Sequence, residues 1–260
     1  GLVKEISNTK FDSSVDIDLV QKIAKYNTTF LKSSKIIREI SKEEQSLQKR
    51  WYDSLNNNKI DYEVYNTDYY LGELWACWVV YSSQHLLKIQ NPKSLFTKSI
   101  IEDIGNIKII IDLGCGFGIT CAYLKTKFPN AKVIGTNLKN TKQFKIAQIY
   151  ADKYGFELID ENTLPQIQAD LIFASEYFEH IVDPIENLDI ILKSFNPRTL
   201  LLANSFTVKA IGHFPSYKNK DKILTGKQIS REFNNYLRNK GYIKVKTKLW
   251  NSRPAYWKKY

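Results

Sequence analysis

The stretch Ile109-Ile-Ile-Asp-Leu-Gly-Cys-Gly-Phe-Gly118 decides the fold of this chain. Its three leading isoleucines are typical of a strand that is covered on both faces. Asp112 ends the strand with a carboxylate, and three glycines within five residues allow a tight turn against which a ligand can lie. A helical pattern follows over residues 119–128. Strand, glycine turn and helix predict the start of a nucleotide-binding α/β unit.

The spacing of the glycines distinguishes this loop from two other nucleotide-binding loops. The dinucleotide motif G-x-G-x-x-G would need a glycine where the chain has Ile119, and no G-x-x-x-x-G-K-[ST] is present. The pattern D-x-G-x-G-x-G over residues 112–118 instead resembles the first motif of the class I S-adenosylmethionine (SAM) dependent methyltransferases.

The resemblance continues in order along the chain and covers about residues 105–260. Further strand-like segments of the expected kind are residues 133–139, 156–160, 169–175, 199–205, 242–250 and 255–260, with a helix over 225–240. The resemblance implies an α/β fold, a doubly wound seven-stranded mostly parallel sheet of the Rossmann-like methyltransferase type, with an antiparallel last strand. We expect a SAM-binding domain at 105–260, preceded by an N-terminal helical extension and pocket cover at 1–104.

The resemblance also implies which residues bind SAM. They lie in the glycine loop and at the ends of the next three strands: Asp112, Gly114, Cys115, Gly116, Gly118, Asn137, Leu138, Asp160, Glu161 and Ser175. Asn137 departs from the family, which usually has an acid there that bonds both ribose hydroxyls; an amide can still bond a hydroxyl, but without the charge. Asp160 stands before Pro165 as the family's adenine-contacting acid stands before a Leu-Pro pair.

The loop after the fourth strand reads Glu176-Tyr-Phe-Glu-His180. If this loop opens a helix, its two glutamates and its histidine share one face. His213, after the fifth strand, could meet them, because substrates of open α/β sheets bind beyond the carboxyl ends of the strands. We therefore predict that Glu176, Glu179, His180 and His213 are the catalytic residues. The same four could bind Mg²⁺ or Mn²⁺ and leave two positions for vicinal hydroxyls.

The E-x-x-E-H sequence resembles motifs of two metal-assisted subgroups, the small-RNA 3′-terminal 2′-O-methyltransferases and the ubiquinone-pathway O-methyltransferases. Similar sequences also follow the fourth strand in small-molecule methyltransferases that use no metal, so a metal site and a metal-free pocket both remain open. The chain lacks [DNS]-P-P-[YF] after this strand, and Cys115 and Cys121 are misplaced for base C5-methylation. O-methylation is therefore favoured over N-methylation.

Composition limits the class of protein. With 260 residues, 43% of them hydrophobic, the chain can bury a full core. It has no apolar run of 18 residues, so no membrane span is expected. Three cysteines form no metal or disulfide framework, and the start shows no signal-peptide pattern, which favours a cytoplasmic protein.

The net charge of +11 is unevenly distributed. Residues 207–260 hold 14 basic and 2 acidic residues. This excess favours either a nucleic acid or a phosphate-bearing substrate as partner, or a solvated lysine-rich surface. The sequence does not indicate the oligomeric state.

Before the glycine loop, helical spacing predicts helices over residues 19–26, 30–47 and 71–89, with a break at Asn56-Asn-Asn. The last of these carries an aromatic and aliphatic stripe with Trp75. Tyr65, Tyr69 and Tyr70 precede it and are expected to line the pocket for SAM and substrate.

Three functional hypotheses follow. The first is a SAM-dependent O-methyltransferase that acts on a hydroxylated small molecule, with or without a phosphate or a sugar group, and is metal-assisted or metal-free. The second is a nucleic-acid 2′-O-methyltransferase that holds phosphates with the basic C-terminal region. The third is a non-catalytic scaffold with the SAM-binding fold.

Overall fold

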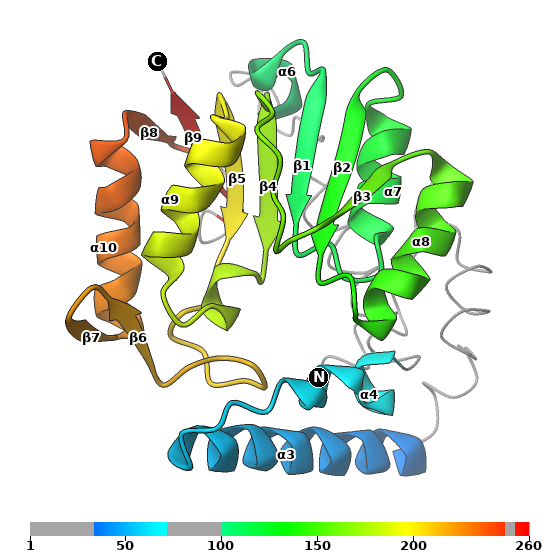
Figure 1. Ribbon diagram of the computed structural model, residues 1–260, viewed down its shortest axis with the longest axis vertical. Coiled ribbons are helices and arrows are strands. Elements are labelled where there is room, and N and C mark those ends of the chain that lie inside the picture. Colours follow the sequence, from blue (N-terminus) through cyan, green and yellow to red (C-terminus); the bar gives the residue numbers. More distant parts are fainter. Residues whose placement is uncertain (1–33, 72–99, 248–252, 260) are drawn as a thin grey trace.

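The computed structural model describes residues 34–71, 100–247 and 253–259. Its main sheet has seven strands in the order β3-β2-β1-β4-β5-β9-β8 (Figure 1). The strands are β1 (Ile109–Leu113), β2 (Lys132–Asn137), β3 (Glu157–Asp160), β4 (Leu171–Ser175), β5 (Thr199–Ala203), β8 (Tyr242–Val245) and β9 (Ala255–Lys259). Strands β1 to β5 run parallel, and β9 runs antiparallel to both β5 and β8. The predicted fold class, including the antiparallel last strand, is therefore confirmed.

Helices connect the strands and cover both faces of the sheet. They are α3 (Ser34–Asn56), the 3₁₀ helix η2 (Tyr62–Asn66), α4 (Asp68–Leu71), α6 (Ile100–Ile104), α7 (Ile119–Lys127), α8 (Lys142–Tyr154), the 3₁₀ helix η4 (Phe178–His180), α9 (Pro184–Phe195) and α10 (Gly226–Asn239). The predicted helix over 225–240 begins after Thr225, whose side chain accepts a hydrogen bond from the backbone N–H of Gln228. This cap satisfies one of the free N–H groups at the start of the helix.

Two apolar layers explain why the central strands are apolar at nearly every position. Ile110 packs on one face of the sheet with residues of α6, α7 and α8. Its neighbour Ile111 packs on the other face with residues of α9 and α10. Successive side chains of a strand point to opposite faces, so a sheet covered on both sides needs apolar residues at consecutive positions.

Helix α3 lies across the edge of the sheet at which β1 and β2 end (Figure 1). Trp51 of this helix is fully buried, and its indole N–H donates to the backbone carbonyl of His213 at 2.7 Å. Its ring also contacts the ring of Phe214, with centroids 5.4 Å apart. The segment before the sheet thus covers the edge where ligands of α/β sheets bind. The proposed domain boundary at residues 104 and 105 stays a prediction.

One element was not predicted. Strands β6 (Ser216–Asn219) and β7 (Lys222–Thr225) form a separate antiparallel hairpin before α10. Both strands have four residues and are mostly polar, so they lack the alternation that marks a longer strand. The turn places Lys220 at a φ of +53°, without the glycine that usually marks such a turn.

Other predictions for the first hundred residues have mixed outcomes. The helix expected over 30–47 is present as α3 and continues to Asn56, where the predicted break occurs. The helices expected over 19–26 and 71–89, with Trp75, lie outside the described residues. Among the residues that the structure describes, no helix is long and apolar enough to cross a membrane.

Candidate active site

The glycine loop joins the end of β1 to α7 in the predicted place. Gly114, Gly116 and Gly118 all have positive φ angles, which other residues rarely adopt. A Cβ on Gly118 would lie 2.7 Å from the ring of Phe156, whereas the space beside Gly116 is open to 4 Å. An open, positive-φ backbone at the end of the first strand fits the close approach of a bound nucleoside.

Asp112 and Cys115 face the protein interior. Asp112 is 2% exposed, and its carboxylate accepts a hydrogen bond from the thiol of Cys121 at 3.2 Å. Burial raises the pKa of Asp112 to about 7. Both cysteines are buried and free, and a Cβ on Gly135 would lie under 3 Å from both sulfur atoms. These residues support the loop from beneath, and the open side of the loop is left to the glycine backbone.

Side chains at the ends of β2, β3 and β4 surround the loop. The amide of Asn137 donates to the carbonyl of Gly116 at 2.9 Å. Asp160 accepts hydrogen bonds from the backbone and side chain of Asn162. Glu161 accepts a hydrogen bond from the hydroxyl of Tyr177. The remaining predicted cofactor residues are Leu138, which is exposed, and Ser175, which is half-buried.

Two glutamates and one histidine come together at the ends of β4 and β5. One ligand atom of each of Glu176, Glu179 and His213 lies within 4.8 Å of the others. The local reason differs from the prediction, because the loop after β4 does not open a helix that carries both glutamates on one face. Glu176 has a φ of +53°, and only Phe178–His180 forms a short 3₁₀ helix. The parallel pairing of β4 with β5 brings the two loops together.

Glu179 is fully buried, and its two carboxylate oxygens differ. Oε1 accepts the backbone N–H of Ser205 at 2.6 Å. Oε2 has no hydrogen-bond partner among the described residues. Burial and the nearby carboxylate of Glu176 raise the pKa of Glu179 well above its ordinary value. A buried oxygen without a partner is costly, so this site suits a proton or a cation next to Glu179.

The two histidines have different surroundings. Nδ1 of His213 lies 2.8 Å from the backbone carbonyl of Val208, and burial lowers the pKa of the imidazole. His180 is not among the residues whose ligand atoms gather within 4.8 Å, which departs from the predicted four-residue site. Its Nδ1 lies 2.9 Å from the hydroxyl of Tyr65, and burial, with the nearby His213, lowers its pKa to about 3.

Sequence reasoning missed Arg253 and Ser205. The guanidinium of Arg253 donates to the carboxylate of Glu176 and to the hydroxyl of Ser205, the latter at 2.6 Å. Arg253 lies 77 positions after Glu176 in the chain, and only the antiparallel return of β9 beside β5 brings it here. No local motif marks it. Ser205 is the last residue of the predicted fifth strand and lies two residues after the observed β5, but a lone serine carries no signal by itself.

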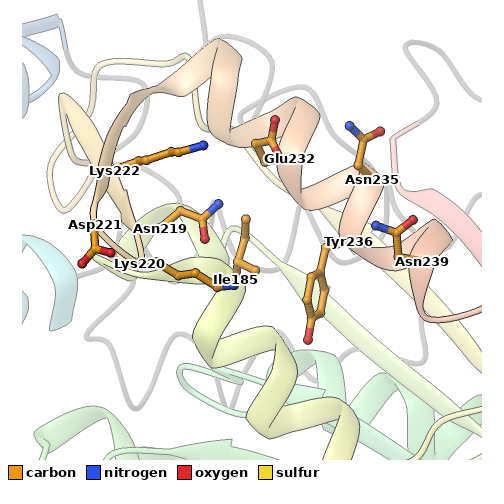
Figure 2. A pocket seen from close by; sticks show the side chains of 9 residues that line it. All are labelled: Ile185, Asn219, Lys220, Asp221, Lys222, Glu232, Asn235, Tyr236 and Asn239. Atoms are coloured by element: carbon orange, nitrogen blue, oxygen red, sulfur yellow. The ribbon is translucent and has the colours of Figure 1, made fainter.

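A pocket of about 330 Å³ lies apart from this site, between the β6–β7 hairpin, α9 and α10 (Figure 2). Most of the residues that line it have polar or charged side chains, among them Asn219, Lys222, Glu232 and Tyr236. None of the residues predicted from the sequence lines it.

Comparison with known proteins gives a family and a fold. A family model described as a methyltransferase domain matches residues 96–246. A trans-aconitate 2-methyltransferase of Escherichia coli O139:H28 is 29% identical over 96 residues, which are 37% of this chain and 38% of that protein. The match therefore spans well under half of the curated relative's length.

Two solved methyltransferase structures are similar to this chain. The structure of a mitomycin 7-O-methyltransferase matches 99% of this chain and 74% of its own chain, with a TM-score of 0.53 and 11% identity. A SAM dependent methyltransferase from Aquifex aeolicus matches 67% of this chain and 95% of its own, with a TM-score of 0.41 and 16% identity. At these identities the likeness concerns the fold alone. Since the family model matches more than half of the sequence, this chain belongs to the methyltransferase domain family and has the fold of the class I SAM-dependent methyltransferases.

Proposed function

We propose that this chain transfers a methyl group from SAM to a hydroxyl oxygen of a small molecule. The observation that carries the proposal is the gathering of Glu176, Glu179 and His213 at the ends of β4 and β5. Strand β4 pairs directly with β1, so the two glutamates of this cluster follow the strand next to the one that leads into the glycine loop. SAM supplies a methyl group on a sulfonium, which leaves the protein to align the acceptor and to remove its proton.

His213 is suited to remove that proton. An imidazole nitrogen beside a carbonyl carries a hydrogen, so the contact with Val208 assigns the proton to Nδ1 and leaves Nε2 as the basic nitrogen. Because burial lowers the pKa of His213, the ring is neutral at pH 7 and can accept a proton. The contact between Trp51 and the His213 carbonyl holds the loop that carries the ring.

The other members of the cluster are suited to orient the acceptor. Arg253 is partly exposed, with 41% of its side chain accessible, and it pairs with Glu176. A guanidinium in this position can also pair with an anionic group of an acceptor. The trans-aconitate 2-methyltransferase among the relatives is named for a polycarboxylate. We therefore include polycarboxylates that carry a hydroxyl group with other hydroxylated and phosphate-bearing compounds in the acceptor class.

A metal-assisted version of the same reaction is the second candidate. Glu176, Glu179 and His213 would hold Mg²⁺ or Mn²⁺, and the buried Oε2 of Glu179, which lacks a hydrogen-bond partner among the described residues, supports this donor set. The ion would lower the pKa of a bound hydroxyl. Arg253 opposes it, because two cations at the carboxylate of Glu176 repel each other.

The test combines binding and turnover. We would incubate the chain with SAM and a panel of catechols, sugar phosphates and hydroxylated polycarboxylates, and measure the release of S-adenosylhomocysteine with EDTA or with Mn²⁺. We expect His213→Ala to lower turnover by about 100-fold or more, the contribution typical of a general base, and Glu179→Gln to lower it in the metal-assisted version, where this carboxylate would hold the ion. Their affinity for S-adenosylhomocysteine, measured by calorimetry, should stay within about twofold of the unaltered chain.

Controls separate the alternatives. Glu186→Gln changes an exposed carboxylate in the first turn of α9 and should leave turnover unchanged. Activity that EDTA abolishes and Mn²⁺ restores would favour the metal-assisted version. Loss of cofactor binding in the site variants would assign these residues to cofactor binding or to the fold instead. An unaltered chain that binds no SAM would favour the scaffold hypothesis.

A further inference from the structure

Asn137, at the position where an acid that binds ribose is expected, has its side chain engaged within the protein. Its Nδ2 donates to the carbonyl of Gly116 at 2.9 Å, and its Oδ1 accepts the backbone N–H of Leu138 at 2.8 Å. The amide therefore ties the glycine loop to the end of β2. A carboxylate in its place could not donate to Gly116, which gives a structural reason for an amide at this position.

Glu161 places a carboxylate beside the same loop. Its backbone N–H donates to the carbonyl of Asn137 at 3.0 Å, so Glu161 stands directly next to the end of β2. Its Oε2 lies 3.5 Å from the hydroxyl of Thr136, which in turn accepts the backbone N–H of Gly114 at 3.0 Å. The carboxylate is thus one hydroxyl group away from the first glycine of the loop.

Tyr177 covers the space between Glu161 and the glycine loop. Its hydroxyl donates to Oε1 of Glu161. Its ring lies so close to Gly114 that a Cβ there would be 2.6 Å from Cδ2 of the tyrosine. Burial raises the pKa of Glu161, so this carboxylate depends on a hydrogen-bond donor to stabilise its charge.

We propose that Glu161, and not Asn137, binds the ribose hydroxyls of SAM, and that the hydroxyl of Tyr177 takes their place on this carboxylate when the cofactor is absent. This rests on the proposed use of SAM. A carboxylate accepts two hydrogen bonds side by side and so matches two adjacent hydroxyls. The exchange of a phenol for a diol keeps the buried carboxylate hydrogen-bonded in both states.

Neighbouring groups fit the role less well. The Oδ1 atom of Asp160, the preceding residue, accepts hydrogen bonds from both the backbone and the side chain of Asn162. Asp112, beneath the loop, is buried against Cys121. Glu161 is the carboxylate at these strand ends whose side-chain partner is a hydroxyl from a different loop, that of Tyr177.

The test measures which side chain senses the ribose. Calorimetry would compare S-adenosylhomocysteine with its 2′-deoxyribose analogue on the unaltered chain, Glu161→Ala, Asn137→Ala and Tyr177→Phe. We expect the unaltered chain to prefer the natural ribose by about tenfold to 100-fold, the range for a hydrogen bond to a charged group. Glu161→Ala should lose both affinity and preference, whereas Asn137→Ala should keep the preference even if a looser loop lowers affinity for both ligands.

Tyr177→Phe should bind S-adenosylhomocysteine as tightly as the unaltered chain or more tightly, because no hydroxyl competes for Glu161. The matched control is Glu157→Gln, which removes an exposed carboxylate from β3 that pairs with Lys132 at the surface. Thermal unfolding of each variant checks that the fold is intact.

The outcomes are distinguishable. A ribose preference that survives in Glu161→Ala and disappears in Asn137→Ala would overturn the assignment. A tenfold loss in Tyr177→Phe would overturn the competing role of the tyrosine. If the unaltered chain binds no S-adenosylhomocysteine, the proposed use of SAM fails together with this inference. If the unaltered chain binds S-adenosylhomocysteine and Glu161→Ala keeps the same preference for the natural ribose, this inference fails and the proposed use of SAM stands.

Discussion

At the scale of single residues, the surroundings of Asp112, Glu161 and Glu179, three buried or half-buried carboxylates, separate them into different roles. Asp112 contacts a thiol inside the core, Glu161 contacts a phenol at the glycine loop, and Glu179 contacts a backbone N–H near the acceptor site. Burial raises the pKa of all three. A pKa raised by burial therefore does not by itself distinguish a supporting carboxylate from a functional one. The hydrogen-bond partners of each carboxylate make that distinction.

We expect Asp112→Asn to weaken the pH dependence of stability. Asp112 has a pKa of about 7 in the folded chain, against an ordinary value of 3.8. Between these values the folded chain holds a proton that the unfolded chain has released, so the free energy of unfolding falls as the pH rises from about 4 to about 7. Asn does not titrate. The free energy of unfolding of Asp112→Asn, minus that of the unaltered chain, should therefore rise by roughly 1.4 kcal/mol for each pH unit between about 4 and 7.

Urea denaturation at pH 5, 6 and 7 measures this shift. Asp152→Asn, an exposed carboxylate on α8, is the control. Parallel pH profiles for Asp112→Asn and the unaltered chain would mean that Asp112 titrates alike in the folded and unfolded states.

Residue identity alone predicted part of the acceptor site. The sequence pointed to Glu176, Glu179 and His213 because the glutamates come directly after one strand-like segment and His213 lies in the loop after the next, and the family fold places these two strands side by side. Arg253 could not be identified as a site residue from the sequence, because no motif near it marks it. Its contact with Glu176 depends on how the last strand returns to the sheet. The separate surroundings of His180 also depend on Tyr65, which comes from a distant segment.

At the scale of elements, α3 links the segment before the sheet to the acceptor site. The helix buries Trp51 against the loop after β5, and the indole N–H bonds the same residue whose imidazole we propose as the base. The side chain of Trp51 therefore couples the position of the loop after β5 to the position of the His213 imidazole, the proposed base. The sequence predicted the helix from its spacing, but its packing partner could not be read from the helix itself.

We expect Trp51→Phe to lower both stability and turnover. Phenylalanine keeps an aromatic ring but lacks the N–H, so the buried carbonyl of His213 loses its donor. Such a loss costs about 1–3 kcal/mol in free energy of unfolding. Turnover should fall because the loop that carries His213 loosens, while affinity for S-adenosylhomocysteine should stay within about twofold.

Urea denaturation and initial rates of methyl transfer measure the two effects. Lys49→Ala, on the exposed side of α3, removes a surface ion pair with Asp53 and should leave both stability and turnover nearly unchanged. Turnover that is unchanged in Trp51→Phe would show that α3 stabilises the fold without positioning the base.

At the scale of the whole molecule, positive charge is concentrated late in the chain. Residues 207–260 hold 14 basic and 2 acidic residues, and many of the described ones, such as Lys218, Lys227 and Arg231, are exposed. An exposed basic surface attracts polyanions whether or not a polyanion is the substrate. Charge alone therefore does not choose between the small-molecule and nucleic-acid hypotheses.

We expect salt to separate binding of RNA from catalysis. A short RNA should lose at least tenfold in affinity between 50 and 200 mM NaCl, because its binding releases counterions. The rate of methyl transfer to a small acceptor, which depends on the buried cluster, should stay within about twofold over the same range. Fluorescence anisotropy and the methyl-transfer assay measure the two quantities. A rate that falls in step with RNA affinity would favour the nucleic-acid 2′-O-methyltransferase.

The sequence by itself determined the sheet, the glycine loop and the family, because these depend on local properties: apolar runs, positive-φ glycines and strand ends at regular spacing. It also selected Glu176, Glu179 and His213, since the ends of neighbouring parallel strands meet at one edge. Only the tertiary structure decided which partner each side chain has. Asn137 bonds the glycine loop, Glu161 faces Tyr177, and Arg253 reaches Glu176. These contacts join segments far apart in the chain, so their geometry exists only once the layers pack together.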